Sequence, residues 1–193
     1  MLFAEVLIDF STGFMVNYSR ITNRGVAMIK GQDIVVLAAL VSGGNHPRSY
    51  APLAERAKLS VSETHAAVKR LQEAMLIDEN RHLCKRNAIE FLTHAIRYVF
   101  PPVVANTSVK GMPTGYAAPV AAAEFAVSGD VSVWPCENGN VVGRAFEPVY
   151  SSVPSAAGAD SELYDSLALI DMLRGGRLRE RAFAGQKLKE LIK

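Results

Sequence analysis

Residues 49–77 constrain the fold most strongly, because they carry a complete start signal for a helix. Ser60 is followed three positions later by Glu63. In this S-x-x-E capping box each side chain bonds the other residue's backbone N–H, and these N–H groups have no partner inside the helix. The side chains expected on its buried face then recur at spacings of three and four; they are Val61, Thr64, Val68, Leu71 and Met75. The sequence therefore predicts a helix from Ser60 with one face buried.

The opposite face of this predicted helix is small, polar and basic. It carries Ser62, His65, Ala66, Lys69, Arg70 and Glu73. A shorter helix is expected just before it, capped by Ser49 and ending at Ala57, with Pro52 acceptable in the first turn. Lys58 and Leu59 would form the turn between the two helices. Two such helices joined by a tight turn are what a helix-turn-helix needs to enter a DNA groove.

A short β-hairpin is predicted directly after the Ser60 helix. Residues 76–78 and 83–85 are suited to extended structure and flank a polar tip at 79–82, which includes Arg81 and His82. A hairpin at this position is typical of a wing whose tip lies near a phosphate backbone. The alternative is a surface hairpin with solvated charges.

Helices are also expected on either side of this segment. Residues 32–41 are helical in composition, with Ile34, Leu37, Ala38 and Val41 on one face and Gly43-Gly44 at the end. Asn87 with Glu90 repeats a capping pattern, and Pro101-Pro102 would stop the helix that follows. Its inward face would consist of Ile89, Leu92, Ile96 and Val99. This helix could contact a second copy of the chain or pack on its own domain.

Residues 30–86 resemble the winged helix-turn-helix domain of bacterial transcription regulators of the MarR and IclR type. The resemblance rests on LAERAKLSVSETHAAVKRLQEAMLI, residues 53–77. It implies a DNA-binding domain over residues 28–100, in which the Ser60 helix reads the major groove through Ser62, His65, Ala66, Lys69 and Arg70. Arg48, Ser49, Tyr50 and Arg81 would hold phosphates. One departure is Met75, since these families usually have Gly there, where the helix ends in a left-handed conformation.

Residues 1–27 show no clean period, and Met28 opens a more regular segment. We interpret 1–27 as an N-terminal extension, which is either an upstream translation artefact or an arm that crosses to a partner subunit.

The second half of the chain predicts a small α+β region. Residues 101–127 are rich in Ala, Gly, Pro and Thr and are expected to form a linker or long loop. Within 128–193, Asn138-Gly139 predicts a β-hairpin with Trp134 in a small core beneath it. Residues 151–160 would be a loop. Two helices separated by Gly175-Gly176 then predict a C-terminal helical hairpin, which begins at an Asp160 or Ser161 cap and has Leu178 and Leu188 on the apolar side of its second helix. This region would dimerise or sense a small molecule or a partner protein.

Composition and charge limit the classes of protein to which this chain can belong. The net charge of +2 does not by itself indicate nucleic-acid binding, so the basic residues that matter must be local. The two cysteines lack metal spacing and suggest a reducing compartment. No apolar run approaches the roughly 20 residues that span a bilayer, and the first ten residues lack a basic leader. We therefore expect a cytoplasmic protein without membrane contact.

No catalytic or metal-binding pattern is present in the sequence. The four histidines lie at 46, 65, 82 and 94, and none has metal spacing with another ligand. The carboxylates Asp160, Glu162, Asp165 and Asp171 are expected to be a cap and a solvated helix face. Arg174, Arg177, Arg179 and Arg181 either bind an anion or form a solvated helix end, and the solvated end is favoured. We therefore expect neither an enzyme nor a cofactor.

Two functions are consistent with these observations. The first is a sequence-specific regulator, expected to act as a repressor, that binds double-stranded DNA as a homodimer. The second is a protein-interaction module, such as an antitoxin-like partner of a neighbouring gene product.

Overall fold

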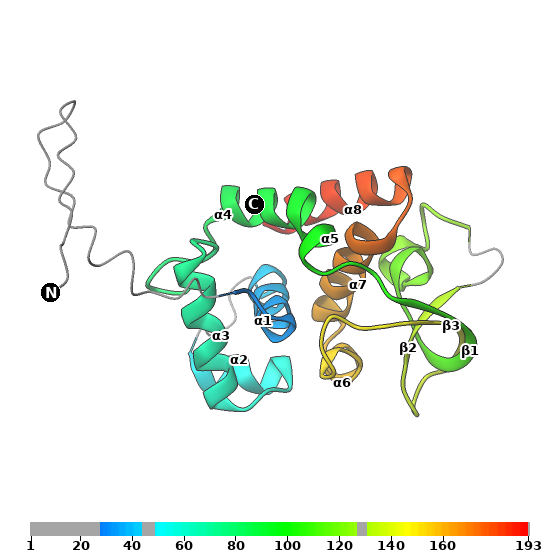
Figure 1. Ribbon diagram of the computed structural model, residues 1–193, viewed down its shortest axis with the longest axis horizontal. Coiled ribbons are helices and arrows are strands. Elements are labelled where there is room, and N and C mark those ends of the chain that lie inside the picture. The colour runs from blue at the N-terminus through cyan, green and yellow to red at the C-terminus, as the bar shows by residue number, and fades with distance from the viewer. Residues whose placement is uncertain (1–27, 44–48, 127–130, 193) are drawn as a thin grey trace, which may run out of the picture.

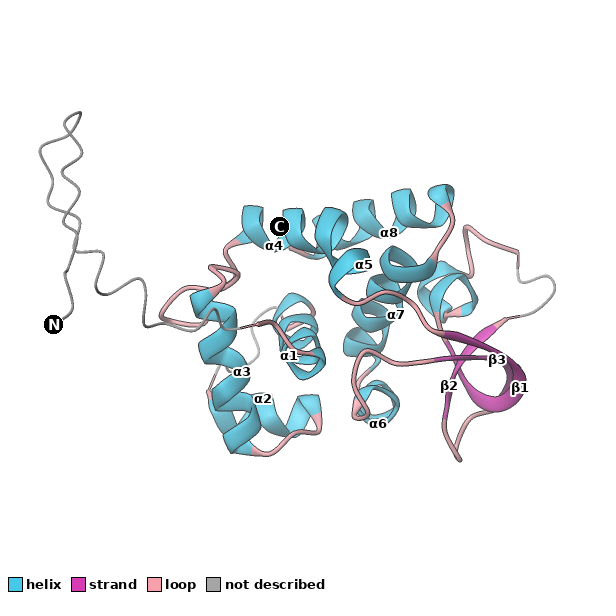
Figure 2. Cartoon of the chain, viewed as in Figure 1, coloured by secondary structure: helices cyan, strands magenta, loops and turns pink. Residues whose placement is uncertain are grey.

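The computed structural model describes residues 28–43, 49–126 and 131–192 (Figure 1). The fold is mixed α+β, as predicted, with helices over more than half of the described residues and a three-stranded sheet at one end. Figure 2 shows the strands grouped away from α1, α2 and α3. The predicted extension at 1–27 and the predicted phosphate contact Arg48 lie outside the described residues.

The first helix, α1 (Gly31–Val41), is the centre of the helical end. Every residue from Asp33 to Val41 is buried, not only the predicted face. The reason is that α1 packs against α2 (Tyr50–Ala57) and α3 (Val61–Glu73), and also against α7 (Ser161–Gly175) of the C-terminal half. An apolar helix with neighbours on all sides has no solvent face.

The turn between α2 and α3 and the start of α3 follow the sequence closely. Lys58 adopts a left-handed conformation with φ 52° and ends α2. The predicted capping box at Ser60 is formed: Glu63 N donates to Ser60 Oγ at 3.1 Å, and Ser60 N donates to Glu63 Oε2 at 2.9 Å. Thr64, Val68 and Leu71 are buried as expected, whereas Val61 and Met75 are exposed.

Residues 76–84 form the predicted hairpin, and its paired region is very short. A single antiparallel bridge joins Ile77 to Leu83, and Asp78 N donates to His82 O at 2.8 Å. The next helix begins at Lys85 rather than at Asn87, so the predicted Asn87 cap was wrong. It continues as α4 (Lys85–Glu90), the π-helical η2 (Phe91–Ala95) and α5 (Ile96–Val99). Leu92 and Ile96 are buried, but Val99 is exposed, which corrects the predicted inward face.

The sheet overturns two predictions. Part of the predicted 101–127 linker is β1 (Val104–Pro113), which pairs antiparallel with both β2 (Ser132–Pro135) and β3 (Val141–Phe146). Strands β2 and β3 are not a hairpin, because they run parallel. Each strand thus pairs with the other two, and the sheet closes on itself.

The surroundings of Gly139 explain why Asn138-Gly139 does not form the predicted hairpin turn. A Cβ at Gly139 would lie 2.2 Å from the Gly111 carbonyl carbon, so the loop after β2 passes directly over β1. Among the described glycines only Gly115 has a positive φ, at 61°. Gly139 is therefore needed for close approach of two backbone segments, and not for a tight hairpin turn.

The C-terminal half is mainly helical. The predicted helical hairpin is present as α7 and α8 (Leu178–Leu191). Asp160 caps α7 by accepting a bond from Leu163 N at 3.0 Å. Residues 151–160, expected to be a loop, contain α6 (Val153–Ala159), and 3-10 turns η3 (Gly115–Ala117) and η4 (Pro119–Ala121) follow β1. Leu188 is buried, but Leu178 is 78% exposed, so its predicted burial was wrong.

One continuous apolar core joins the two halves. It includes buried side chains of α1 and α3, Trp134 of β2 and most of α7. Helix α7 lies between α1 and the sheet in Figure 1, and it also packs against α5 and α8. The proposed division into domains stays a prediction. None of the described helices combines the length and apolar character needed to cross a membrane.

A buried polar cluster lies where α7 meets the sheet. Asp171 accepts bonds from Trp134 Nε1 at 2.6 Å, Thr114 Oγ1 at 3.0 Å and Arg174 Nη1 at 2.6 Å. Arg174 also donates to carbonyls of Phe100, at 2.9 Å, and of Glu147, at 3.3 Å. Asp171 and Arg174 were expected to be solvated, and this was wrong because each is almost fully buried with charged and polar partners.

Candidate nucleic-acid interface

Three of the predicted contact residues meet on one surface, although they come from three different elements. The rings of Tyr50, at the start of α2, and His65, on α3, lie 5.0 Å apart between centroids. The Arg81 guanidinium, from the 76–84 hairpin, lies 5.0 Å from the centre of the Tyr50 ring. Cations over an aromatic face are attracted by the ring electrons. This Tyr50–His65–Arg81 stack therefore joins α2, α3 and the hairpin side by side.

The exposed face of α3 extends from this stack. Ser62, His65 and Lys69 are exposed, and Ala66 is partly exposed. Ser49 is exposed at the N-cap of α2, and among the described residues its side chain makes no capping bond. A hydroxyl, an imidazole and an ammonium group at helical spacing supply donors for phosphate or base edges.

Arg70 has a different environment from Lys69. Its Nε and Nη2 atoms donate to the two carboxylate oxygens of Asp33 at 2.8 Å and 2.6 Å. The bond to Asp33 raises the pKa of Arg70, and its side chain is only 15% exposed beside a fully buried carboxylate. A DNA contact by Arg70 stays a prediction, but this two-bond ion pair argues against it because the guanidinium joins α3 to α1 instead.

Met75 has the backbone conformation that its position suggested. Its φ is 56°, in the left-handed region that favours glycine, and its side chain is 67% exposed. Asn87 Nδ2 donates to the Met75 carbonyl at 2.8 Å. The start of α4 therefore supports the end of α3, and Asn87 serves this purpose rather than capping its own helix.

The hairpin tip is held by Asp78. Its carboxylate accepts from His82 N at 2.8 Å and lies 3.2 Å from His82 Nδ1. The bond from the His82 backbone lowers the pKa of Asp78. Arg81 has φ 64° in this tight turn, which directs its side chain toward Tyr50.

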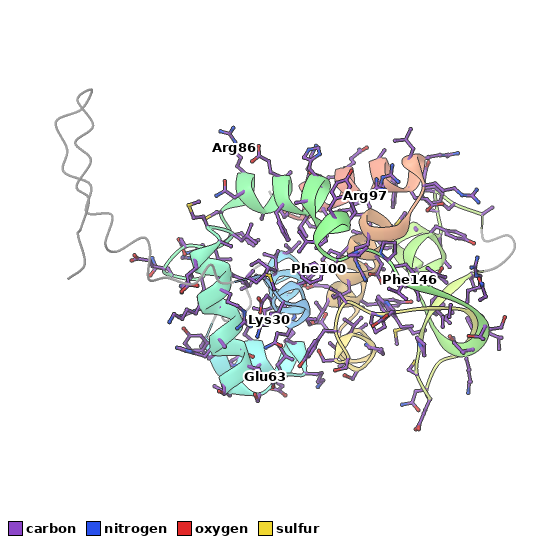
Figure 3. All side chains as sticks on the ribbon, in the orientation of Figure 1. Lys30, Glu63, Arg86, Arg97, Phe100 and Phe146 are labelled. Atoms are coloured by element: carbon purple, nitrogen blue, oxygen red, sulfur yellow. The ribbon has the colours of Figure 1, made fainter. Side chains whose placement is uncertain are left out.

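Sequence reasoning missed the contacts that the C-terminal half makes with α2 and α3. Tyr150 OH donates to Glu63 Oε1 at 3.1 Å, and Ser152 Oγ donates to the Ala57 carbonyl at 2.9 Å. Bonds from Ser60, with that from Tyr150, lower the pKa of Glu63. Figure 3 labels Glu63 at the end of α3 where it meets α2. Nothing near Tyr150 in the sequence signals this contact, since the partners lie 87 positions apart.

A cavity of about 560 Å³ lies at the other end of α7, where α8 begins. Its lining includes Arg144, Arg177, Arg179, Glu124 and Glu180. Arg179 pairs with Glu124 at 2.8 Å, and Glu180 accepts the Arg177 N–H at 2.9 Å. Within the described ranges no three His, Cys, Asp or Glu side chains are grouped as a metal site. The α3 surface thus remains the best-defined candidate site.

Comparison with protein-family models, with curated protein sequences and with solved structures found no significant match to this chain.

Proposed function

We propose that this protein is a sequence-specific DNA-binding transcription regulator whose α2, α3 and 76–84 hairpin act as a winged helix-turn-helix. The observation that carries the proposal is the Tyr50–His65–Arg81 stack. It brings the start of α2, the exposed face of α3 and the hairpin tip onto one surface, and these three parts contact DNA in winged helices.

In this proposal α3 enters the major groove. Ser62, His65 and Lys69 reach base edges or nearby phosphates, and Ala66 allows close approach. Ser49 and Arg81 contact phosphates on either side, with Arg81 held in place by Tyr50. Arg48 keeps its proposed phosphate contact, and Arg70 is left out because Asp33 engages it. The protein would act as a homodimer and repress its target, with the C-terminal half sensing a ligand or partner.

Selection of bound duplexes from random DNA, followed by anisotropy titration, tests this proposal. The decisive pair of variants is Lys69→Ala on α3 and Arg86→Ala on α4, an exposed cation that the proposal does not assign to the interface. We expect Lys69→Ala to weaken binding to the selected duplex about 5- to 100-fold and Arg86→Ala to leave it unchanged. If selection enriches no sequence, or both variants bind like wild type, the proposal is wrong.

A protein-interaction module, such as an antitoxin-like partner, is the second candidate. It is favoured by two exposed apolar side chains, Val61 at the start of α3 with 53% exposure and Met75 just after its end with 67% exposure. Apolar side chains of this kind supply contact area to protein partners rather than to phosphate. Co-expression with the neighbouring gene product distinguishes the two: a stoichiometric complex lost in Val61→Ser/Met75→Ser, without retention on heparin, favours the module.

A further inference from the structure

Residues 150–160, which we call the clasp, contact the α2–α3 turn from both sides. On the α2 side, Ser152 Oγ donates to the Ala57 carbonyl at 2.9 Å, and Arg56 Nε donates to Asp160 Oδ2 at 2.5 Å. On the α3 side, Tyr150 OH donates to Glu63 Oε1 at 3.1 Å. The clasp therefore spans the turn and bonds both helices.

Arg56 extends the connection to α1. Its Nη1 donates to the Ala39 carbonyl at 2.6 Å, and its side chain is only 10% exposed. Asp160, its partner, is also the residue that caps α7. One guanidinium thus links α1, α2 and the start of α7. Helix α2 has only eight residues, and helices this short depend on such tertiary contacts.

The turn between the two helices is short. It consists of the left-handed Lys58, Leu59 and the extended Ser60, and Leu59 N donates to the Ala54 carbonyl at 2.9 Å. Outside the turn, the two helices pack on each other and both pack on α1, and the clasp adds hydrogen bonds to both of them. Within the described chain the clasp supplies such bonds at the very ends where the two helices meet.

We infer that the clasp sets the relative position of α2 and α3, and that Tyr150 is a positioning residue of the DNA interface. The inference rests on the proposed function. The proposed contacts Ser49 and Tyr50 lie at the N-terminal end of α2, whereas Ser62, His65 and Lys69 lie on α3. A change in the angle between the helices moves one set relative to the other, so both sets no longer meet one groove together.

Tyr150 also holds the negatively charged carboxylate of Glu63 in place. Glu63 follows the proposed contact Ser62, and a free carboxylate there would repel phosphates. One of its oxygens accepts from Ser60 N at 2.9 Å and Ser60 Oγ at 2.6 Å, and the other accepts from Tyr150. Both oxygens are thereby engaged in hydrogen bonds within the protein.

Tyr150→Phe and Ser152→Ala, each in the full-length protein, test the inference. Each removes one hydroxyl and keeps the surrounding packing. The matched control is Tyr164→Phe, because the Tyr164 hydroxyl donates to the Pro113 carbonyl of β1 at 2.6 Å and not to α2 or α3. The probe is a duplex recovered from random DNA by wild-type protein, titrated well below the melting temperature of every variant.

We expect Tyr150→Phe and Ser152→Ala each to weaken binding about 2- to 10-fold, and Tyr164→Phe to lower the melting temperature without changing affinity. In a Glu63→Gln background, Tyr150→Phe should have a smaller effect, since the two side chains act together. Equal affinity of Tyr150→Phe, Ser152→Ala and wild type overturns the inference and leaves the proposed function intact. If wild type itself selects no duplex, the proposed function fails and the inference fails with it.

Discussion

The two halves of the molecule bury a carboxylate–arginine pair in different ways. Asp33 lies at the first turn of α1 and is bonded by Arg70 from α3, whose side chain still reaches the surface. Asp171 lies inside α7 and is bonded by Trp134, Thr114 and Arg174, and both charged side chains are almost wholly enclosed. The first pair joins two helices beneath the candidate interface. The second holds the sheet to α7.

The two ion pairs therefore serve different purposes in the two halves. On α3, the Arg70 side chain is mostly buried against Asp33, whereas the neighbouring Lys69 side chain is exposed. In the C-terminal half the charged pair serves the interior alone, and Arg174 donates to main-chain carbonyls that follow α5 and β3. We therefore expect the second pair to contribute more to stability, and the surface around the first pair to carry the binding function.

The largest effect is expected for Asp171→Ala. It leaves the Arg174 guanidinium buried without its carboxylate, and such losses cost about 3–5 kcal/mol. Urea denaturation measures the change in free energy of unfolding. The control is Asp165→Ala on the same helix, because burial raises the pKa of both carboxyls but, of the two, only the Asp171 side chain has hydrogen-bond partners among the described residues. Similar losses in both variants would contradict a special role for Asp171.

Asp33→Ala is expected to cost less, about 2 kcal/mol, because the released Arg70 side chain can turn into water. The same denaturation assay measures it, with the exposed Glu73→Ala as control. A loss as large as that of Asp171→Ala would remove the contrast between the two pairs.

Met75→Gly is expected to stabilise the protein by about 1 kcal/mol. Glycine adopts φ 56° without the steric cost that Met75 bears, and the exposed side chain contributes little packing. Ala74→Gly, one residue earlier and with φ −80°, is the control and should destabilise. A lower melting temperature for Met75→Gly would show that the Met75 side chain contributes more than its exposure suggests.

The smallest effect concerns alkaline pH. Burial, with nearby Asp165 and Cys136, raises the pKa of Tyr164 to about 12. Between the unfolded value of about 10 and this value the folded state retains a proton that the unfolded state has lost, so stability falls as pH rises through this range. Tyr164→Phe should flatten the fall between pH 10 and 12. The effect is modest because Tyr164 is only half buried, and an unchanged slope would contradict it.

Local signals predicted much of the helical end, because capping and turn chemistry act over a few residues. Ser60 with Glu63, Asp160 and the left-handed Met75 all behave as their neighbours in sequence suggested. The failures involve long-range partners. The first half of strand β1 is exposed, so its residue composition resembles that of a loop. Its partner residues lie about 20 to 40 positions away in the sequence, so no local signal marks the pairing.

The candidate site shows the same limit. Tyr50, His65 and Arg81 were each predicted to contact DNA, and the contacts that join them into one stack were not predicted. Arg70 was assigned to the outer face because its partner lies 37 positions earlier. A signal was present: Asp33 is a lone charge next to the apolar run that follows it, and buried charges require partners. The Tyr150 contact had no such signal.

The salt dependence of DNA binding tests the central claim most directly. Arg81→Ala and Arg86→Ala each remove one exposed or partly exposed arginine, but only Arg81 belongs to the stack on the proposed interface. We predict that the slope of log affinity against log salt falls by about one unit for Arg81→Ala, the share of one phosphate contact, and is unchanged for Arg86→Ala. Identical slopes for wild type and both variants would contradict the account.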